Sequence, residues 1–148
     1  VITCALADDR RPSPAERDFA RRLGSATRQS ELLRDFTADL RRGRIYLPAE
    51  TLETAGLSAE VAAAEPPLDE FAGPLGEWRE RLLKELNEIP GLLDDSERES
   101  QRHGLVLAAL HERLLSRIEF SDGVSDRVTH VPPLVRLWTA WRTAMRYA

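Results

Sequence analysis

Carboxylate and guanidinium side chains are crowded together in one stretch of this 148-residue chain, "LLRDFTADLRRGRIYLP" at residues 32–48. Asp35 and Asp39 are four residues apart, and Glu31 precedes Asp35 by the same interval. In a helix this spacing places all three carboxylates on one face. Like charges at this spacing destabilise a helix by about 0.2–0.5 kcal/mol per pair. The carboxylates therefore need compensation, either from neighbouring arginines or from a bound cation.

The simpler interpretation is a solvated charged face, neutralised by Arg28, Arg34, Arg41 and Arg42. Spacing alone favours it, because charged helical faces are common and exposed ion pairs contribute little to stability. The alternative is a magnesium site, since Mg²⁺ takes one or two protein carboxylates and fills its other positions with water and substrate phosphate. Arginines beside the metal would bind diphosphate oxygens and stabilise the negative charge of a departing diphosphate.

The motif lies near the end of a long predicted helix. Ser13, Pro14 and Glu16 form a helix start with a capping box, and Gly43 is a natural stop. Between them, apolar residues recur at helical spacing and predict a core-facing stripe: Phe19, Leu23, Ala26, Leu33, Phe36 and Leu40.

The rest of the chain also has helical periodicity. We expect a short helix ending near Gly56, a weakly patterned connection, a helix over 68–89 interrupted at Gly73-Pro74, a third helix within 94–120, and a short terminal helix after a loop. No segment alternates strongly at period two. The prediction is an all-α fold of antiparallel helices, with residues 1–148 forming part of one domain.

Composition narrows the function classes. The net charge of −4 gives no basic footprint, so nucleic acid is not expected as a partner. A single cysteine, Cys4, forms no internal disulfide and fits a reducing cytoplasm. The apolar start "VITCALA" resembles the tail of a buried helix, and we expect the chain to be a piece of a longer protein.

The acidic motif and the residues after it resemble the second aspartate-rich region of the squalene/phytoene synthase family, whose members join prenyl diphosphates head to head. The resemblance rests on Arg34-Asp35, Asp39, the run Gly43 to Pro48, Leu52 and Gly56. "EWRERLLKELNEIPGL" and "LVLAALHERLLSRIEF" are also similar to the C-terminal half of that family. The resemblance covers nearly all of this chain but only about the last half of the family's length.

The resemblance implies an isoprenoid synthase type of helical bundle with an apolar cavity. It implies that Asp35 and Asp39 bind Mg²⁺, that Arg34 and Arg44 support the motif or contact diphosphate, and that Tyr46 lies near the site. The family's first aspartate-rich motif is absent from this chain. We therefore expect catalysis to require an N-terminal half or a second chain that carries it.

Three positions depart from the family pattern. Arg28 and Glu31 stand where the family has glutamine and asparagine, so Glu31 is either a third metal ligand or a partner of Arg28. Both are expected to take part in substrate binding, as is Arg127 in the loop before the last helix, and Arg136 is a second candidate for that basic rim. The same loop lacks the tyrosine that the family commonly has there.

Three functions stay open at this stage. The first is magnesium-dependent coupling of two prenyl diphosphates, giving a squalene-, phytoene- or presqualene-type product. The second is a related prenyltransferase that acts on an aromatic or other small acceptor. The third is a non-catalytic relative that serves as an interaction subunit.

Other residues with chemical potential have plainer interpretations. His103, His111 and His130 have no partners at zinc-site spacing, so we expect structural or surface roles. Trp138 and Trp141 make the terminal helix amphipathic, and the expectation is core packing. The alternative is contact with a membrane surface, in which case a cytoplasmic protein would be peripherally membrane-associated.

Overall fold

The computed structural model describes residues 11–47, 49–54, 69–120 and 129–147, and every regular element among them is helical. The prediction of an all-α fold is therefore confirmed. The elements in chain order are α2 (Pro14–Leu40), α3 (Ala49–Thr54), α5 (Asp69–Glu88), the 3₁₀ turn η1 (Ile89–Leu92), α6 (Asp95–Ser100), α7 (Arg102–Leu115) and α8 (Pro133–Arg146).

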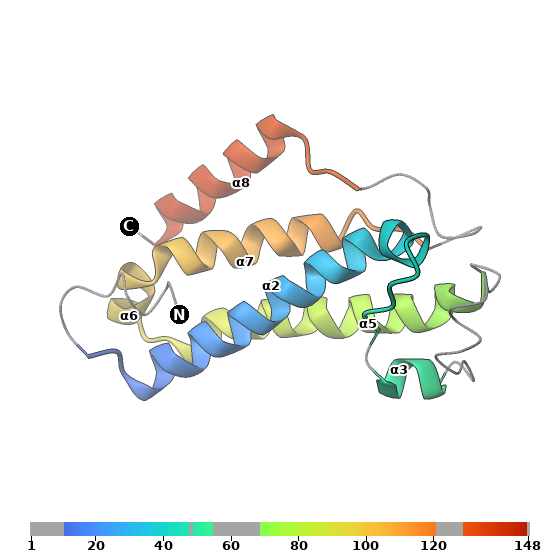
Figure 1. The fold of residues 1–148 in the computed structure, drawn as a ribbon. Coiled ribbons are helices and arrows are strands. Elements are labelled where there is room, and N and C mark those ends of the chain that lie inside the picture. Colours follow the sequence, from blue (N-terminus) through green and yellow to red (C-terminus); the bar gives the residue numbers. More distant parts are fainter. Residues whose placement is uncertain (1–10, 48, 55–68, 121–128, 148) are drawn as a thin grey trace.

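The long helices run alternately in opposite directions (Figure 1). Helices α2, α5 and α7 pack on one another, and α8 lies against the outer side of α7. The short α3 lies beside α5. The predicted antiparallel arrangement is thus present, with α2 and its acidic motif packed against both α5 and α7.

Helix α2 begins and ends where the sequence predicts. The Ser13 hydroxyl accepts a hydrogen bond from the Glu16 amide at 3.0 Å, while the Glu16 carboxylate accepts from the Ser13 amide at 2.7 Å. At the other end Gly43 adopts a positive φ of 67°, which a residue with a Cβ rarely tolerates. The Arg44 amide then donates to the Asp39 carbonyl at 2.9 Å, so the chain turns sharply after the motif.

The predicted apolar stripe of α2 forms the centre of the core. Five of its six members are buried and Leu40 is partly buried against them. Phe36 packs on Phe71 of α5 with ring centroids 5.2 Å apart. Gly104 lets α7 approach closely, because a Cβ there would lie 2.7 Å from the Phe19 ring. These contacts hold α2 against both α5 and α7.

Two predicted boundaries are wrong. Helix α5 continues through Pro74 instead of breaking there, although proline has no amide to donate within the helix. Burial of Phe71 and Leu75, on either side of Pro74, offsets that loss. The predicted third helix is divided at Gln101 into α6 and α7. Gln101 is buried, and its side-chain amide donates to Glu16 at 3.1 Å, a long-range contact that sequence periodicity does not reveal.

Glu16 joins the start of α2 to the α6–α7 junction. It is fully buried, and its second oxygen accepts hydrogen bonds from the Ser100 hydroxyl and the Gln101 amide, each at 3.1 Å. The Ser13 hydroxyl donates in turn to Glu97, the capping-box residue of α6. These contacts connect the first turn of α2 to both helices that follow η1.

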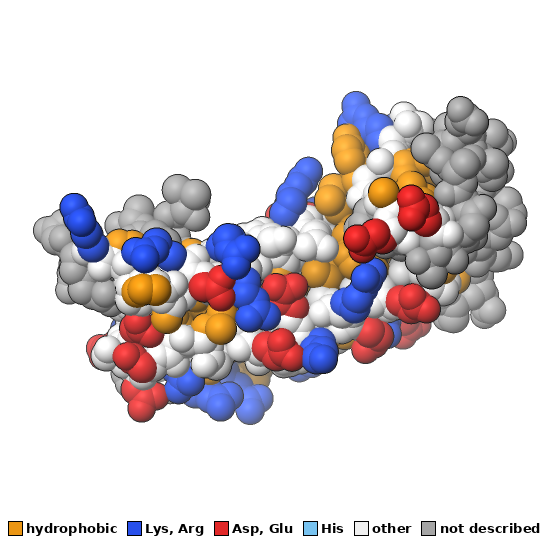
Figure 2. Space-filling model, turned by 90° about the horizontal axis from the view of Figure 1, so that it is seen from below, with side chains coloured by type: hydrophobic (Ala, Val, Ile, Leu, Met, Phe, Trp, Pro, Cys, Tyr) orange, Lys and Arg blue, Asp and Glu red, His pale blue; other side chains and the backbone are white. Residues whose placement is uncertain are grey.

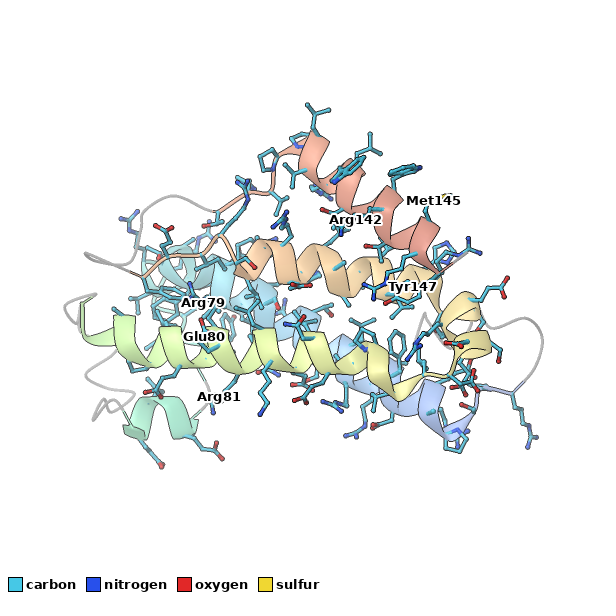
Figure 3. The ribbon with its side chains drawn as sticks, turned by 180° about the vertical axis from the view of Figure 1, so that it is seen from behind. Arg79, Glu80, Arg81, Arg142, Met145 and Tyr147 are labelled. Atoms are coloured by element: carbon cyan, nitrogen blue, oxygen red, sulfur yellow. The ribbon has the colours of Figure 1, made fainter. Side chains whose placement is uncertain are left out.

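Arg79 joins α5 to the end of α7. Its side chain lies between the two helices (Figure 3) and donates to the Ile118 carbonyl at 2.5 Å. The same guanidinium also contacts Glu80 on its exposed side, at 2.7 Å.

The expectation of core packing for the terminal helix is wrong for both tryptophans. Trp138 is 58% exposed and Trp141 is 54% exposed, whereas Tyr147 at the end of α8 packs against the core. Leu107 of α7 is 38% exposed. No helix in the described part of the chain is long and apolar enough to cross a bilayer.

Candidate functional site

The first two motif residues form an ion pair. The Arg34 guanidinium donates to both oxygens of Asp35, from Nε at 2.8 Å and from Nη2 at 2.7 Å. The two side chains are about one third exposed. These hydrogen bonds lower the pKa of Asp35 and raise that of Arg34, so Asp35 is ionised at neutral pH. Two neighbouring residues of one helix thus provide a fixed carboxylate and a fixed cation.

The other two carboxylates of the face differ in their partners. Glu31 contacts Arg28 at 3.4 Å, at a site where both side chains are substantially exposed. Glu31 was expected to be either a third metal ligand or a partner of Arg28, and in this structure it pairs with Arg28. Asp39 is partly buried, and no described residue donates a hydrogen bond to its carboxylate or pairs with it. Asp39 is accordingly the carboxylate of the face that is available to a cation.

The remaining predicted site residues do not contact the carboxylates through their side chains in the described part of the chain. Arg44 and Tyr46 are exposed in the turn after the helix, and Tyr46 is 49% exposed. Arg127 lies outside the described residues, as does Cys4. Among the described residues, Arg44 is connected to the motif through its backbone hydrogen bond to Asp39.

A hollow of about 260 Å³ lies beside this face of α2. Glu31 and Arg34 line it from α2, and Arg136 lines it from α8. Its apolar wall comes from α7, as Leu107, Leu110 and Leu114. Asp35 and Asp39 are not among the lining residues, but Asp35 is fixed to Arg34, which is. The structure therefore brings the acidic motif to the edge of a partly apolar hollow.

Histidine residues complete the hollow, which sequence reasoning did not anticipate. His111 of α7 and His130 of the segment before α8 both line it. The Nδ1 atom of His111 is buried and has no hydrogen-bond partner in the part of the chain that the structure describes. Burial lowers the pKa of His111, against an opposing effect from the nearby Glu31, so its ring is neutral at pH 7. Only packing of α7 on α2 reveals this role, since 80 residues separate Glu31 from His111.

The described residues offer Mg²⁺ two carboxylate ligands but no complete ligand set. Asp35 and Asp39 supply hard oxygen ligands one turn apart, and a magnesium ion needs only one or two such carboxylates from the protein. No group of three or more acidic, histidine or cysteine residues within the described ranges could hold a metal by itself. A magnesium ion here would thus share Asp35 with Arg34 and take further ligands from water or phosphate.

Comparison with known proteins identifies the family. The family model for squalene/phytoene synthase matches residues 1–136, which include the acidic motif, α5 and α7. The chain belongs to the squalene/phytoene synthase family. The motif that predicted this membership lies inside the matched region.

The curated relatives that match this chain include several phytoene synthases. It is 35% identical over 108 residues to phytoene synthase 2, chloroplastic, of Solanum lycopersicum, covering 68% of this chain and 32% of the relative. It is 34% identical to phytoene synthase 2, chloroplastic, of Zea mays, and the match covers 68% of this chain and 25% of the relative. The bifunctional lycopene cyclase/phytoene synthase of Colletotrichum graminicola is 30% identical over 138 residues, covering 87% and 23%. The chain spans a third or less of these relatives, and no solved structure matches it.

Proposed function

We propose that this chain provides the second aspartate-rich wall of a magnesium-dependent enzyme that joins prenyl diphosphates head to head. The observation that carries the proposal is the Asp35–Asp39 pair, set in a motif that resembles this family's, beside a hollow with an arginine at its edge. Family membership supports the reaction class. The facing wall, with the first aspartate-rich motif, would come from another segment or a second chain.

Each motif residue has a distinct part in this proposal. Asp39 has no partner among the described residues, so its carboxylate would be the first ligand offered to the metal. Asp35 would be the second, using the lone pairs that Arg34 leaves free, since a carboxylate accepts about four hydrogen bonds or metal contacts. When bound, Mg²⁺ would stabilise the negative charge that builds up on a departing diphosphate.

The cationic residues of the hollow suit the diphosphate itself. Arg34 and Arg136 line the hollow from two different helices, and guanidinium groups bind phosphate oxygens through paired hydrogen bonds. The neutral, half-buried His111 ring beside them offers one nitrogen that has no hydrogen-bond partner among the described residues. The three leucines opposite would contact the first apolar carbons of a prenyl chain. Arg44 and Arg127 would form the outer rim.

A binding experiment tests the site in the chain itself. Inorganic diphosphate is titrated into the chain by isothermal calorimetry, with magnesium and with a chelator. We expect binding only with magnesium, its loss in Asp39→Asn, and a weakening of about 10–100-fold in Arg34→Gln, because Arg34 orients a metal-binding carboxylate. Asp18→Asn is the matched control, an aspartate of the same helix paired with Arg21 far from the hollow.

The outcomes separate the competing functions. Magnesium-independent binding, or none, would favour a non-catalytic interaction subunit. Full binding by Asp39→Asn would disprove its assignment as a metal ligand. In the complete enzyme, Asp35→Ala and Asp39→Ala should each abolish turnover of labelled geranylgeranyl or farnesyl diphosphate while the helical content is kept.

A second candidate is a prenyltransferase with a small non-prenyl acceptor. It is favoured by one observation, the Arg28–Glu31 ion pair at positions where the family has neutral amides. Product analysis separates the two candidates. A product with one prenyl unit on an aromatic or other small acceptor would replace head-to-head coupling as the proposed reaction.

A further inference from the structure

A groove of about 730 Å³ lies between α7 and the second half of α8, and we call it the α7–α8 groove. Its floor is apolar, because Leu86 of α5 and Leu105 and Ala108 of α7 line it. Trp138 of α8 and Tyr147, which follows α8, add aromatic surface. Pockets that bind small molecules are mostly apolar clefts of about 300–1,000 Å³. The groove therefore has the size and the lining of a small-molecule site.

The α7–α8 groove is separate from the hollow beside the acidic motif, and no described residue lines both. Helix α7 borders the two spaces through different faces, with Leu107 and His111 in the hollow and Ala108 and Glu112 in the groove. The part of α8 that lines the groove lies after residue 136, where the family match ends. The groove is thus distinct from the site proposed above for magnesium and diphosphate.

Arginines line the groove from both helices. Arg113 lies on α7, and Arg142 and Arg146 lie on α8. Arg142 is on the side of α8 that faces α7, whereas Met145 points away from α7 (Figure 3). None of the three arginines forms an ion pair with a described residue, and Arg146 approaches the Tyr147 ring at 5.6 Å.

Positive charge is in excess in the groove. Glu112 is the one acidic residue among the described residues that line it, although the whole chain has a net charge of −4. On the face of the molecule opposite α8, acidic and basic side chains are interspersed instead (Figure 2). Arg146 also borders a second hollow that contains two acidic residues of α6. Arg113 and Arg142 are therefore the arginines that we expect to contact a ligand.

We propose that the α7–α8 groove binds a small organic anion with a compact aromatic or apolar body. The carboxylate or phosphate group of this ligand would accept hydrogen bonds from Arg113 and Arg142, since guanidinium groups bind both kinds of anion through paired N–H groups. The body of the ligand would lie on Leu105 and Ala108, beside the Trp138 ring. This inference is independent of the proposed catalysis.

The dimensions of the groove favour a small ligand over a segment of another protein. Its lining on α7 extends from Leu105 to Arg113, which is a length of about 12 Å along the helix. Leu86 and Pro90 border it as well, so the groove meets a ligand from more than two elements. A standard protein interface, by contrast, takes about 800 Å² from each partner. A ligand of one or two rings fits this space.

The indole N–H signals of the ¹⁵N-labelled chain give a direct measurement. Trp138 lines the groove, Trp141 does not, and Trp78 is only 3% exposed and donates to Gln29. The full chain is titrated with 2-naphthoate, with 2-naphthyl phosphate and with the neutral 2-naphthamide. We expect both anions to give a saturable shift of the Trp138 signal, larger than that of Trp141, and the amide to bind about tenfold more weakly. The tighter of the two anions identifies the preferred charged group.

Variants assign the binding to the groove. Arg113→Gln and Arg142→Gln should each weaken 2-naphthoate binding about tenfold, because each removes a hydrogen bond to a charged group. Glu112→Gln should strengthen it by up to about fivefold, because it removes a like charge. Arg117→Gln, at an exposed arginine just after α7 that does not line the groove, is the matched control and should bind like the unmodified chain. Circular dichroism verifies that each variant is folded.

Other results overturn the proposal. If neither anion shifts the Trp138 signal at millimolar concentrations, the groove is not a site for small organic anions. Equal affinities for 2-naphthoate and 2-naphthamide would show that the arginines do not select an anion. Binding that is unchanged in both arginine variants would place the ligand elsewhere. Asp39→Asn should bind 2-naphthoate like the unmodified chain, and a loss there would mean that the anion occupies the proposed metal site instead.

Discussion

Replacing the buried Glu16 should destabilise the fold more than any other single change to a charged residue of α2. Glu16 is fully buried and accepts hydrogen bonds from the Ser13 amide at 2.7 Å and from Ser100 and Gln101 at 3.1 Å. Glu16→Ala removes all three and leaves the buried Gln101 amide without this acceptor. A buried donor left unsatisfied costs about 1–3 kcal/mol, and the lost capping interaction costs about 1 kcal/mol, so we expect a loss of about 2–4 kcal/mol.

Two further variants define the cause. Glu16→Gln keeps the shape but replaces one oxygen with a donor, so it should cost about 1–3 kcal/mol. Glu99→Ala removes an exposed glutamate of α6 and should change stability by less than about 0.5 kcal/mol. The free energy of unfolding is measured by urea titration with far-UV circular dichroism. A loss below about 1 kcal/mol in Glu16→Ala would refute the view that this carboxylate holds α2 to the α6–α7 junction.

Three other changes test packing and electrostatics. Gly104→Ala should lower the free energy of unfolding by up to about 2 kcal/mol in the same urea assay, because the clash of its Cβ with Phe19 exceeds the gain in helix propensity. Gly24→Ala adds a Cβ that meets no atom within 4 Å, so it should raise the free energy of unfolding by up to about 1 kcal/mol. Arg34→Gln should raise the pKa of Asp35 towards its ordinary value, which NMR of the carboxyl carbon measures. The Arg34–Asp35 pair stabilises the fold by less than about 1 kcal/mol at pH values above the ordinary pKa of an aspartate. This stabilisation is lost as the pH falls through the lower pKa of Asp35 in the folded state. Burial lowers the pKa of His111, so the free energy of unfolding should decrease as the pH falls from the ordinary histidine pKa of 6.5 towards the pKa in the folded state. The free energy of unfolding of His111→Gln, measured at several pH values, should not show this decrease. Equal acid sensitivity of the two proteins would contradict the last prediction.

The sequence alone determined the features that depend on near neighbours. The capping box at Ser13, the turn at Gly43, the apolar stripe of α2 and the i,i+4 placement of Asp35 and Asp39 all follow from spacing within one helix, because helix geometry is regular and local. The run from Gly43 to Pro48 also indicated the family, since its order is specific.

Only the tertiary structure decided which distant residues meet. The break at Gln101 exists because Glu16, 85 positions away, offers its side chain a buried acceptor. His111 joins the hollow because α7 packs on α2. The exposure of Trp138 follows from the way α8 lies on α7. A helical pattern says that one face is apolar, but the free energy of burial depends on the surface that lies opposite, and that is settled only when the helices pack.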